Sequence, residues 1–100
     1  MQYNFEWNPH KAHINLRKHG VAFEEASKVF DDQMAITIFD DEESSANEDR
    51  WATIGQIKGQ YYLLVVHTYH DNSNDDDSVT IRLISARAAT KHEIKQYQQG

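Results

Sequence analysis

The stretch Val79-Thr80-Ile81-Arg82-Leu83-Ile84-Ser85-Ala86-Arg87 decides how the rest of this sequence is interpreted. Its β-branched and aliphatic residues predict a strand, and Thr90-Lys91-His92-Glu93 predicts the start of a helix directly after it. Two arginines within six positions are costly to keep in a core strand, because each guanidinium group must find an anion or an acceptor. Arg82 and Arg87 therefore indicate a surface that meets phosphate. Strict alternation places them on opposite faces, so that they act together only if the strand ends or bulges near Ser85.

Three stretches upstream alternate in hydrophobicity or are continuously apolar, and they predict further strands. With the strand just described, the expected ranges are 35–39, 50–57, 61–69 and 78–86. Lys58-Gly59 predicts a tight hairpin turn between the two middle strands. After the last strand, Thr90 and Glu93 predict a capping box for a helix that is expected to end near Gln98.

The first thirty residues predict a short strand followed by two helices. Alternation places Tyr3, Phe5 and Trp7 on one face of the strand. Asn8-Pro9 supplies an N-cap and a first helical residue, and the first helix is expected to end at about His19.

The inner faces of the two helices follow from their apolar spacing. Ala12 and Leu16 are expected to face the core from the first helix, and Gly20 fits the left-handed residue after its end. A second helix is expected over about residues 23–30. The chain is thus expected to be a single α+β domain over residues 1–100, with an antiparallel four-stranded meander sheet, a short N-terminal strand, two N-terminal helices and one C-terminal helix.

Composition excludes several classes of function. The chain contains no cysteine, so that neither a disulfide framework nor a thiolate zinc site is available. No apolar stretch approaches the roughly 20 residues that cross a bilayer, and the first residues lack the features of a secretory signal. Gly-rich phosphate loops and Ser/His/Asp patterns are absent, and His10 and His13 have no further ligands at a suitable spacing. We therefore expect a cytoplasmic protein with no membrane segment, cofactor or metal site.

The net charge of −6 disfavours nucleic acid as a ligand, but the charges are unevenly distributed. Residues 31–49 and 71–77 hold twelve of the sixteen acidic residues. Residues 1–30 carry four basic residues against three acidic ones, and residues 78–100 carry four against one. A local basic face can therefore form where the two ends of the chain meet. The acidic stretches are either solvated loops or a surface for a basic partner, and residues 71–77 are expected to be mobile.

Four phrases of the sequence resemble the BrnT family of type II toxins, in the family's order and spacing. They are NLRKHGV at 15–21, FEEA at 23–26, RWATIG at 50–55 and ISARAA at 84–89. The resemblance implies a RelE-like ribonuclease fold and an activity that cleaves RNA without a metal ion and inhibits translation. It also implies a BrnA-type antitoxin, a ribbon-helix-helix protein that neutralises the toxin, forms a dimer or heterotetramer with it and links the complex to operator DNA.

RNA cleavage without a metal ion needs a base for the 2′-hydroxyl group, an acid for the leaving 5′-oxygen and cations for the charge that develops on the phosphoryl oxygens. Arg82 and Arg87 are the expected phosphate clamps, because a guanidinium fork matches two oxygens, and Arg50 at the start of a neighbouring strand is expected to join them. His67 is the expected proton carrier. The alternatives are that each arginine pairs with a carboxylate, and that His67 is a structural residue held by a threonine or a backbone carbonyl.

Basic side chains of the first helix are the expected contacts to the RNA backbone. They are Lys11, Arg17, Lys18 and His19. Tyr97 of the last helix is expected to stack on a base or to donate a proton. The alternatives are a solvated helix face and a tyrosine that only packs. For the whole protein, the alternative to an endoribonuclease is a catalytically weak interaction module that acts mainly as a co-repressor with its antitoxin.

Overall fold

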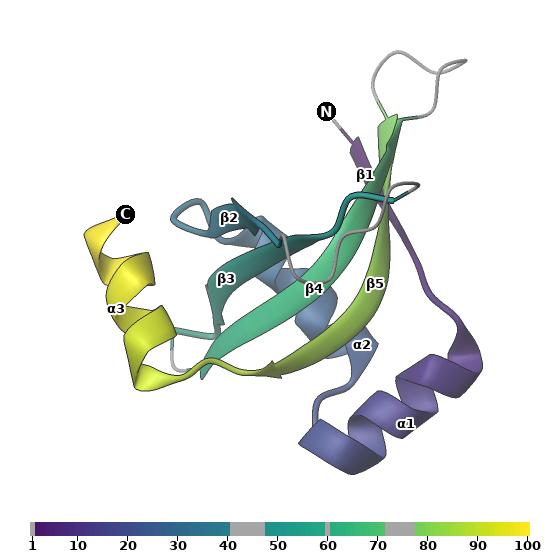
Figure 1. Ribbon diagram of the computed structural model, residues 1–100, viewed down its shortest axis with the longest axis horizontal. Helices are drawn as coiled ribbons and strands as arrows, with labels where there is room; N and C mark the ends of the chain where they lie inside the picture. Colours follow the sequence, from purple (N-terminus) through teal and green to yellow (C-terminus); the bar gives the residue numbers. More distant parts are fainter. Residues whose placement is uncertain (1, 41–47, 60, 72–77) are drawn as a thin grey trace.

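A mixed five-stranded sheet in the order β1-β5-β4-β3-β2 runs through the protein (Figure 1). The computed structural model describes residues 2–40, 48–59, 61–71 and 78–100. The strands are β1 (Gln2–Glu6), β2 (Ile36–Phe39), β3 (Trp51–Ile57), β4 (Tyr61–Asp71) and β5 (Ser78–Ala88). The helices are α1 (Pro9–His19), α2 (Phe23–Ala26), the 3₁₀ helix η1 (Ser27–Asp31) and α3 (Lys91–Gln99). Residues 41–47 and 72–77 of the two acidic stretches lie outside the described residues, and so does the predicted mobility of the second stretch.

The fold is α+β as expected, but the expectation of an antiparallel four-stranded sheet with a separate N-terminal strand is wrong. β1 joins the sheet at its edge and pairs in parallel with β5, with Tyr3 opposite Val79 and Phe5 opposite Ile81. The other three strand pairs are antiparallel. The physical reason is that the outer edge of β5 carries backbone groups that need partners, and β1 supplies them. The sheet is therefore mixed.

Helix and turn boundaries follow the capping signals of the sequence. The side chain of Asn8 accepts hydrogen bonds from two backbone N–H groups of the first turn, and Gly20 ends α1 with a left-handed φ of 72°. Thr90 and Glu93 form the capping box of α3. Lys58 and Gly59, in the short connection between β3 and β4, both have positive φ, as tight hairpin connections favour. The second helix is shorter than expected, because the chain tightens from α2 into η1.

The inner face of α1 differs from the expected one, since Leu16 is 47% exposed and Asn15 is buried. The amide of Asn15 donates to the carbonyls of Val21 and Ala86 and accepts from the N–H of Ala86. The two hydrogen bonds to Ala86 dock α1 on β5, and the one to Val21 holds the chain that follows α1. A polar side chain at an inner position thus replaces the apolar contact that the spacing favoured.

The core lies between one face of the sheet and the segment formed by α2 and η1, which runs behind the sheet in Figure 1. Phe23, Val29, Val65 and Leu83 are its central residues, each at most 1% exposed. Gly55 permits this packing, because a Cβ atom there would lie 2.8 Å from the Cβ of Val29. No helix within the described ranges has the length and the apolar content of a membrane span.

Candidate functional site

A β-bulge interrupts β5 at Ile84. On one side of it Leu83 pairs with His67 of β4, and on the other side Ser85 pairs with Val66, so that Ile84 is the extra residue. An extra residue of this kind reverses the alternation of side chains along a strand. Residues on either side of the bulge therefore share a face at odd separations instead of even ones.

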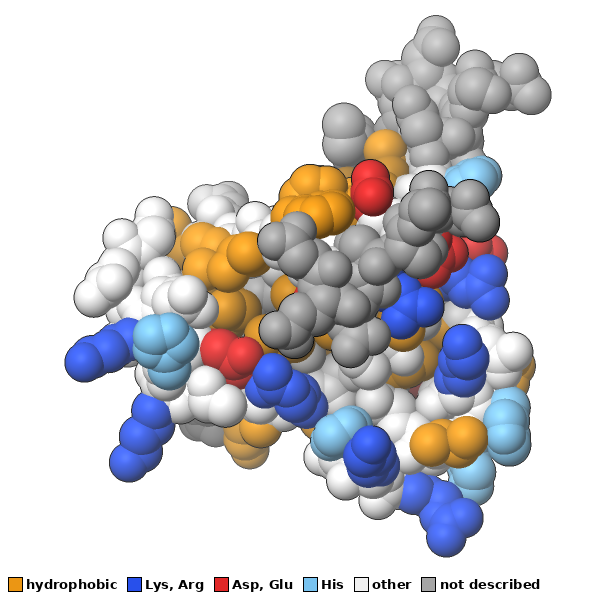
Figure 2. Space-filling model, viewed as in Figure 1, with side chains coloured by type: hydrophobic (Ala, Val, Ile, Leu, Met, Phe, Trp, Pro, Cys, Tyr) orange, Lys and Arg blue, Asp and Glu red, His pale blue; other side chains and the backbone are white. Residues whose placement is uncertain are grey.

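The bulge places Arg82 and Arg87 on the same face of the sheet, which is the condition that the sequence set for them to act together. Their partners on β4, Thr68 and Leu64, lie four residues apart and hence on one side of that strand. Arg50, which lies just before β3, lines a groove with Arg87 on this side. We call this side, defined by the three arginines, the arginine face. It is opposite the face covered by α2 and η1, and Figure 2 shows it toward the viewer.

The largest hollow on the arginine face is a groove of about 490 Å³ that crosses the ends of several elements. Its lining consists of Asp40, Arg50, Ala52, Leu64, Val66, Ile84, Ser85, Arg87 and Glu93. Four aliphatic side chains, two arginines, two carboxylates and one serine make up this lining. Such a groove can hold a sugar or base on the aliphatic part and a phosphate near the guanidinium groups.

A second depression of about 190 Å³ adjoins the groove, because Ile84 and Ser85 line both. Lys11, Lys18 and His19 of α1 line it together with Ile14 and Asn15. Figure 2 shows Lys, Arg and His side chains gathered over α1 and the adjoining part of the sheet. Of the four side chains of α1 expected to contact RNA, three thus line a depression beside the groove, whereas Arg17 lines neither hollow.

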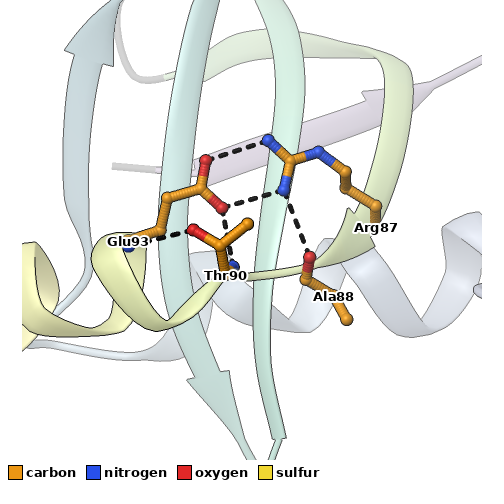
Figure 3. A network of polar contacts seen from close by, with 4 residues as sticks. All are labelled: Arg87, Ala88, Thr90 and Glu93. Atoms are coloured by element: carbon orange, nitrogen blue, oxygen red, sulfur yellow. Dashed lines mark hydrogen bonds and ion pairs between the residues drawn. The ribbon is translucent and has the colours of Figure 1, made fainter.

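Arg87 is bonded to a carboxylate in the same groove (Figure 3). Its Nη1 donates to Oε1 of Glu93 at 2.8 Å and its Nη2 donates to Oε2 at 2.9 Å. The hydrogen bonds from Arg87 lower the pKa of Glu93 to about 2, and the same contact raises the pKa of Arg87. The backbone N–H of Thr90 also donates to Glu93. Because the Arg87 side chain is still 39% exposed, a phosphate can reach it by exchanging with this carboxylate.

The other two arginines differ in their surroundings. Arg50 donates from Nε to Oε1 of Glu48 at 3.3 Å. Arg82 is exposed and lines a separate depression of about 130 Å³ beside Glu6. The β4 partners of Arg82 and Arg87 are four residues apart, about 13 Å along the strand. The arginines therefore share a face, but Arg82 and Arg87 line different hollows, and their expected joint clamp on one phosphate stays a prediction.

His67 lies on the other face, and the expectation that it carries protons at the site is corrected by its burial. Its side chain has no exposed surface, and its ring packs edge-on against Phe30 and Tyr69 with centroids 4.9 Å away. Its Nε2 is 2.7 Å from Oγ1 of Thr53. Burial lowers the pKa of His67 to about 4. This is the structural role, held by a threonine, that was the alternative.

Tyr97 is half-buried and held by two contacts, and its role in stacking on a base or donating a proton stays a prediction. Its hydroxyl group donates to Oδ2 of Asp32 at 2.7 Å, and its ring packs edge-on against Tyr62 with a centroid distance of 5.4 Å. The hydrogen bond to Asp32 raises the pKa of Tyr97 to about 12. Asp32 further accepts from the backbone N–H of Gln56. The tyrosine thus anchors α3 to the sheet.

Comparisons with known proteins bear on what this face does. A family model described as "Ribonuclease toxin, BrnT, of type II toxin-antitoxin system" matches residues 7–93. The solved structure of the ribonuclease toxin BrnT of Brucella abortus is similar, with a TM-score of 0.59 and 19% identity, over 91% of this chain and 100% of that chain. No curated protein matches the sequence. The structural likeness concerns the fold.

Proposed function

Because this chain belongs to the BrnT family of type II toxin–antitoxin ribonuclease toxins, whose model matches residues 7–93, we propose that it is an endoribonuclease. It cleaves RNA in the cytoplasm without a metal ion and inhibits translation, on a fold of the RelE-like kind. A BrnA-type antitoxin of the ribbon-helix-helix class neutralises it and links the complex to operator DNA. The observation that carries the proposal is the groove in which Arg50 and Arg87 flank an aliphatic lining.

The guanidinium groups of this groove stabilise the reacting phosphate. The 2′-hydroxyl group of RNA attacks the adjacent phosphorus and gives up its proton to solvent, and the bond from phosphorus to the 5′-oxygen breaks. Negative charge grows on the two phosphoryl oxygens that take part in neither bond. In the ion pair with Glu93, two carboxylate oxygens occupy the positions that two phosphate oxygens take against the Arg87 fork. RNA binding therefore exchanges one bidentate partner for another. Arg50 approaches the same phosphate from the start of β3.

Proton transfer is assigned to His19, since His67 is buried on the other face. Within the described residues, His19 is the imidazole that lines either the groove or the adjoining depression. A ring N–H of His19 can serve as the acid that protonates the leaving 5′-oxygen. Lys11 and Lys18 beside it bind the flanking phosphates by charge.

Cleavage of a single-stranded RNA by the purified protein tests this proposal, with and without EDTA. Arg87→Ala and Arg50→Ala should each lower the cleavage rate at least 100-fold, the order found when one charge-stabilising donor is removed. Lys95→Ala is the matched control, because Lys95 is an exposed cation on α3 outside the groove, and it should cleave at the wild-type rate. Loss of cleavage in EDTA that Mg²⁺ restores would contradict the metal-independent mechanism.

The Arg87–Glu93 pair favours a second candidate function, since it keeps the main cation of the groove bonded to a carboxylate. In that case the protein is a catalytically weak module that acts as a co-repressor with its antitoxin. Expression in growing cells separates the two. An endoribonuclease arrests growth and loses the arrest in Arg87→Ala while still binding the antitoxin, whereas a co-repressor module causes no arrest that the substitution can remove.

A further inference from the structure

The most buried side chain of α1 is polar, and the reaction described above gives it no part. Asn15 is 5% exposed, and of the other residues of α1 Ala12 is half-buried and the rest are exposed. Ile14 and Leu16, its apolar neighbours, are each 47% exposed. Burying an amide costs free energy unless its polar atoms are bonded. The contact of α1 with the sheet is therefore built around one amide group instead of an apolar stripe.

Two hydrogen bonds of Asn15 reach the part of β5 that lies beyond β1. β1 pairs with β5 as far as Arg82, and Ala86 lies four residues further along. There Oδ1 of Asn15 accepts from the N–H of Ala86 at 3.0 Å, and Nδ2 donates to its carbonyl at 2.9 Å. A neighbouring strand would bond to one residue in the same way, with one acceptor and one donor. The Asn15 amide thus takes the place of a strand at this edge of the sheet.

Ala86 lies between two residues of the candidate site. Ser85 before it lines both the groove and the adjoining depression, and Arg87 after it lines the groove. The bonds to Ala86 therefore hold α1 against the point of β5 where the two hollows meet.

The cationic side chains of the depression share a helix face with Asn15. They are Lys11, four residues before it, and Lys18 and His19, three and four residues after it. Side chains at these separations are neighbours on an α-helix. The rotation of α1 that brings the Asn15 amide to Ala86 is thus the rotation that brings these side chains to the depression.

The third hydrogen bond of Asn15 fixes the end of the helix. Its Nδ2 donates to the carbonyl of Val21 at 3.0 Å, across His19 and the left-handed turn at Gly20. His19 is the last residue of α1, so that its backbone is held both by the helix and by this bond. Asn15 therefore determines both where α1 lies on β5 and how His19 is presented.

This position matters because two elements must act on one phosphate. In the proposed reaction the 2′-oxygen bonds to phosphorus and its proton passes to solvent, while the bond to the 5′-oxygen breaks and that oxygen takes a proton from His19. The products are a 2′,3′-cyclic phosphate and a 5′-hydroxyl group. Arg87 of β5 holds the phosphoryl oxygens, whereas His19 belongs to α1. A misplacement of about 1 Å between such groups lowers a rate roughly 100-fold. Apolar packing has no direction, whereas hydrogen bonds fix distance and angle.

We propose that, in the RNA cleavage of the proposed function on which this inference rests, Asn15 is a positioning residue. It sets His19 of α1 against the 5′-oxygen of the phosphate that Arg87 of β5 holds. Its replacement should therefore impair proton transfer to the leaving group, and leave the other parts of the reaction intact.

Two RNA oligonucleotides that differ in one atom provide the test. The first is a natural single-stranded RNA, and the second carries sulfur in place of the 5′-oxygen at the linkage that the protein cleaves. A thiolate is a weaker base than an alkoxide and leaves without a proton, so that cleavage of the second RNA needs no acid. A smaller folded fraction slows both reactions equally, whereas a displaced His19 slows only the first.

Asn15→Gln is the variant that changes position with the least change in chemistry, because it keeps the amide and adds one methylene group. In single-turnover measurements with saturating protein, it should cleave the natural RNA at least about tenfold more slowly than the wild type. It should cleave the sulfur-containing RNA within about twofold of the wild-type rate. Asn15→Ala, which removes the amide, and His19→Ala, which removes the acid, should show the same selective loss.

Ile57→Ala is the matched control for lost stability. Ile57 is buried in the core at the end of β3 and lines neither the groove nor the depression, so that its truncation opens a cavity away from the site. The ratio of its rates on the two RNAs should equal that of the wild type.

Equal losses on the two RNAs in Asn15→Gln would overturn the inference, and so would a wild-type rate on the natural RNA. If far-UV circular dichroism shows that neither Asn15 variant folds, the residue serves the fold as a whole, which overturns the inference as well. A wild type that cleaves neither RNA would instead sink the proposed function itself. A wild type that cleaves both, with equal losses in the variant, would sink only the role of Asn15.

Discussion

The two faces of the sheet carry opposite kinds of side chain although they share the same strands. The arginine face presents three guanidinium groups, and the other face presents aromatic rings such as Tyr69 together with the core. The bulge at Ile84 keeps the charged side chains and the apolar side chains of β5 on different faces. It returns Arg87 to the side of Arg82 although an odd number of positions separates them. One extra residue in β5 thus keeps two charged groups out of the core. A face built for charge can therefore lie directly on the back of a face built for apolar contact.

Deletion of Ile84 should break this separation, and it is the change with the largest expected effect. Without the bulge, one half of β5 must reverse its alternation, which drives an arginine into the core and an apolar residue out of it. An unpaired buried charge costs several kcal/mol, which is comparable to the whole free energy of unfolding of a small domain. We therefore expect no folded protein at 25 °C. Far-UV circular dichroism during heating measures this loss.

The control for the deletion keeps the number of residues. Ile84→Val removes one methylene group and should stay within about 1.5 kcal/mol of the wild type. A deletion variant that melts cooperatively near the temperature of the wild type would show that the bulge is not what sorts the two faces.

Much of the fold was predictable because its signals are local. Asn8 and Gly20 bound α1 as expected, and the capping box of Thr90 and Glu93 opens α3. The parallel pairing of β1 was not predictable, because a five-residue strand carries no information on which distant edge it joins. The burial of Asn15 was missed for a similar reason, since its partners, such as Ala86, come from elsewhere in the chain.

The arrangement of the candidate site residues was only partly predictable, and their roles stay predictions. Arg50 and Arg87 line one groove. The bulge that puts Arg82 and Arg87 on the same face depends on how β5 pairs with β4, and no residue pattern in β5 indicates it. The burial of His67 did leave a signal, because alternation from Leu63 through Val65 places it on the apolar side of β4. The alternatives named for Arg87 and His67 were the ones that the packing selected.

Acid titration should sharpen the comparison from the face covered by α2 and η1, where His67 is buried and held neutral. Burial lowers the pKa of His67 to about 4 from an ordinary value of 6.5. The unfolded chain therefore takes up a proton that the folded chain refuses as the pH falls from 6.5 to about 4, and stability that is complete above pH 6.5 is lost over this window. We expect a loss of about 2 to 3 kcal/mol in urea denaturation between pH 7 and pH 4.5.

Two histidine variants separate this effect from the titration of carboxylates. His67→Gln removes the titrating group and keeps a side chain that can bond to Thr53, so that its stability should depend less on pH in this window. His70→Gln removes an exposed histidine of the same strand and should follow the wild type. The same pH dependence in His67→Gln and wild type would show that the imidazole does not titrate as its burial requires.

Glu93→Gln sharpens the comparison from the arginine face, and it has the smallest expected effect on stability. Hydrogen bonds from Arg87 hold the pKa of Glu93 at about 2, below its ordinary 4.5, so that the pair stabilises the fold above pH 4.5 and loses this contribution as the pH falls to about 2. Since Arg87 is 39% exposed, solvent screens the pair, and we expect a loss of less than about 1 kcal/mol at pH 7. Urea denaturation measures it.

The same substitution should have an opposite effect on RNA binding, because it releases the Arg87 fork to phosphate. We expect the affinity for a single-stranded RNA oligonucleotide, measured by fluorescence anisotropy, to rise several-fold in Glu93→Gln. Glu24→Gln is the matched control, because it changes the net charge equally at an exposed position of α2 outside the groove. If the two variants bind RNA equally, the gain comes from net charge alone and Arg87 serves to anchor α3. A gain confined to Glu93→Gln would mean that the carboxylate and the RNA phosphate compete for one guanidinium group, as the exchange mechanism requires.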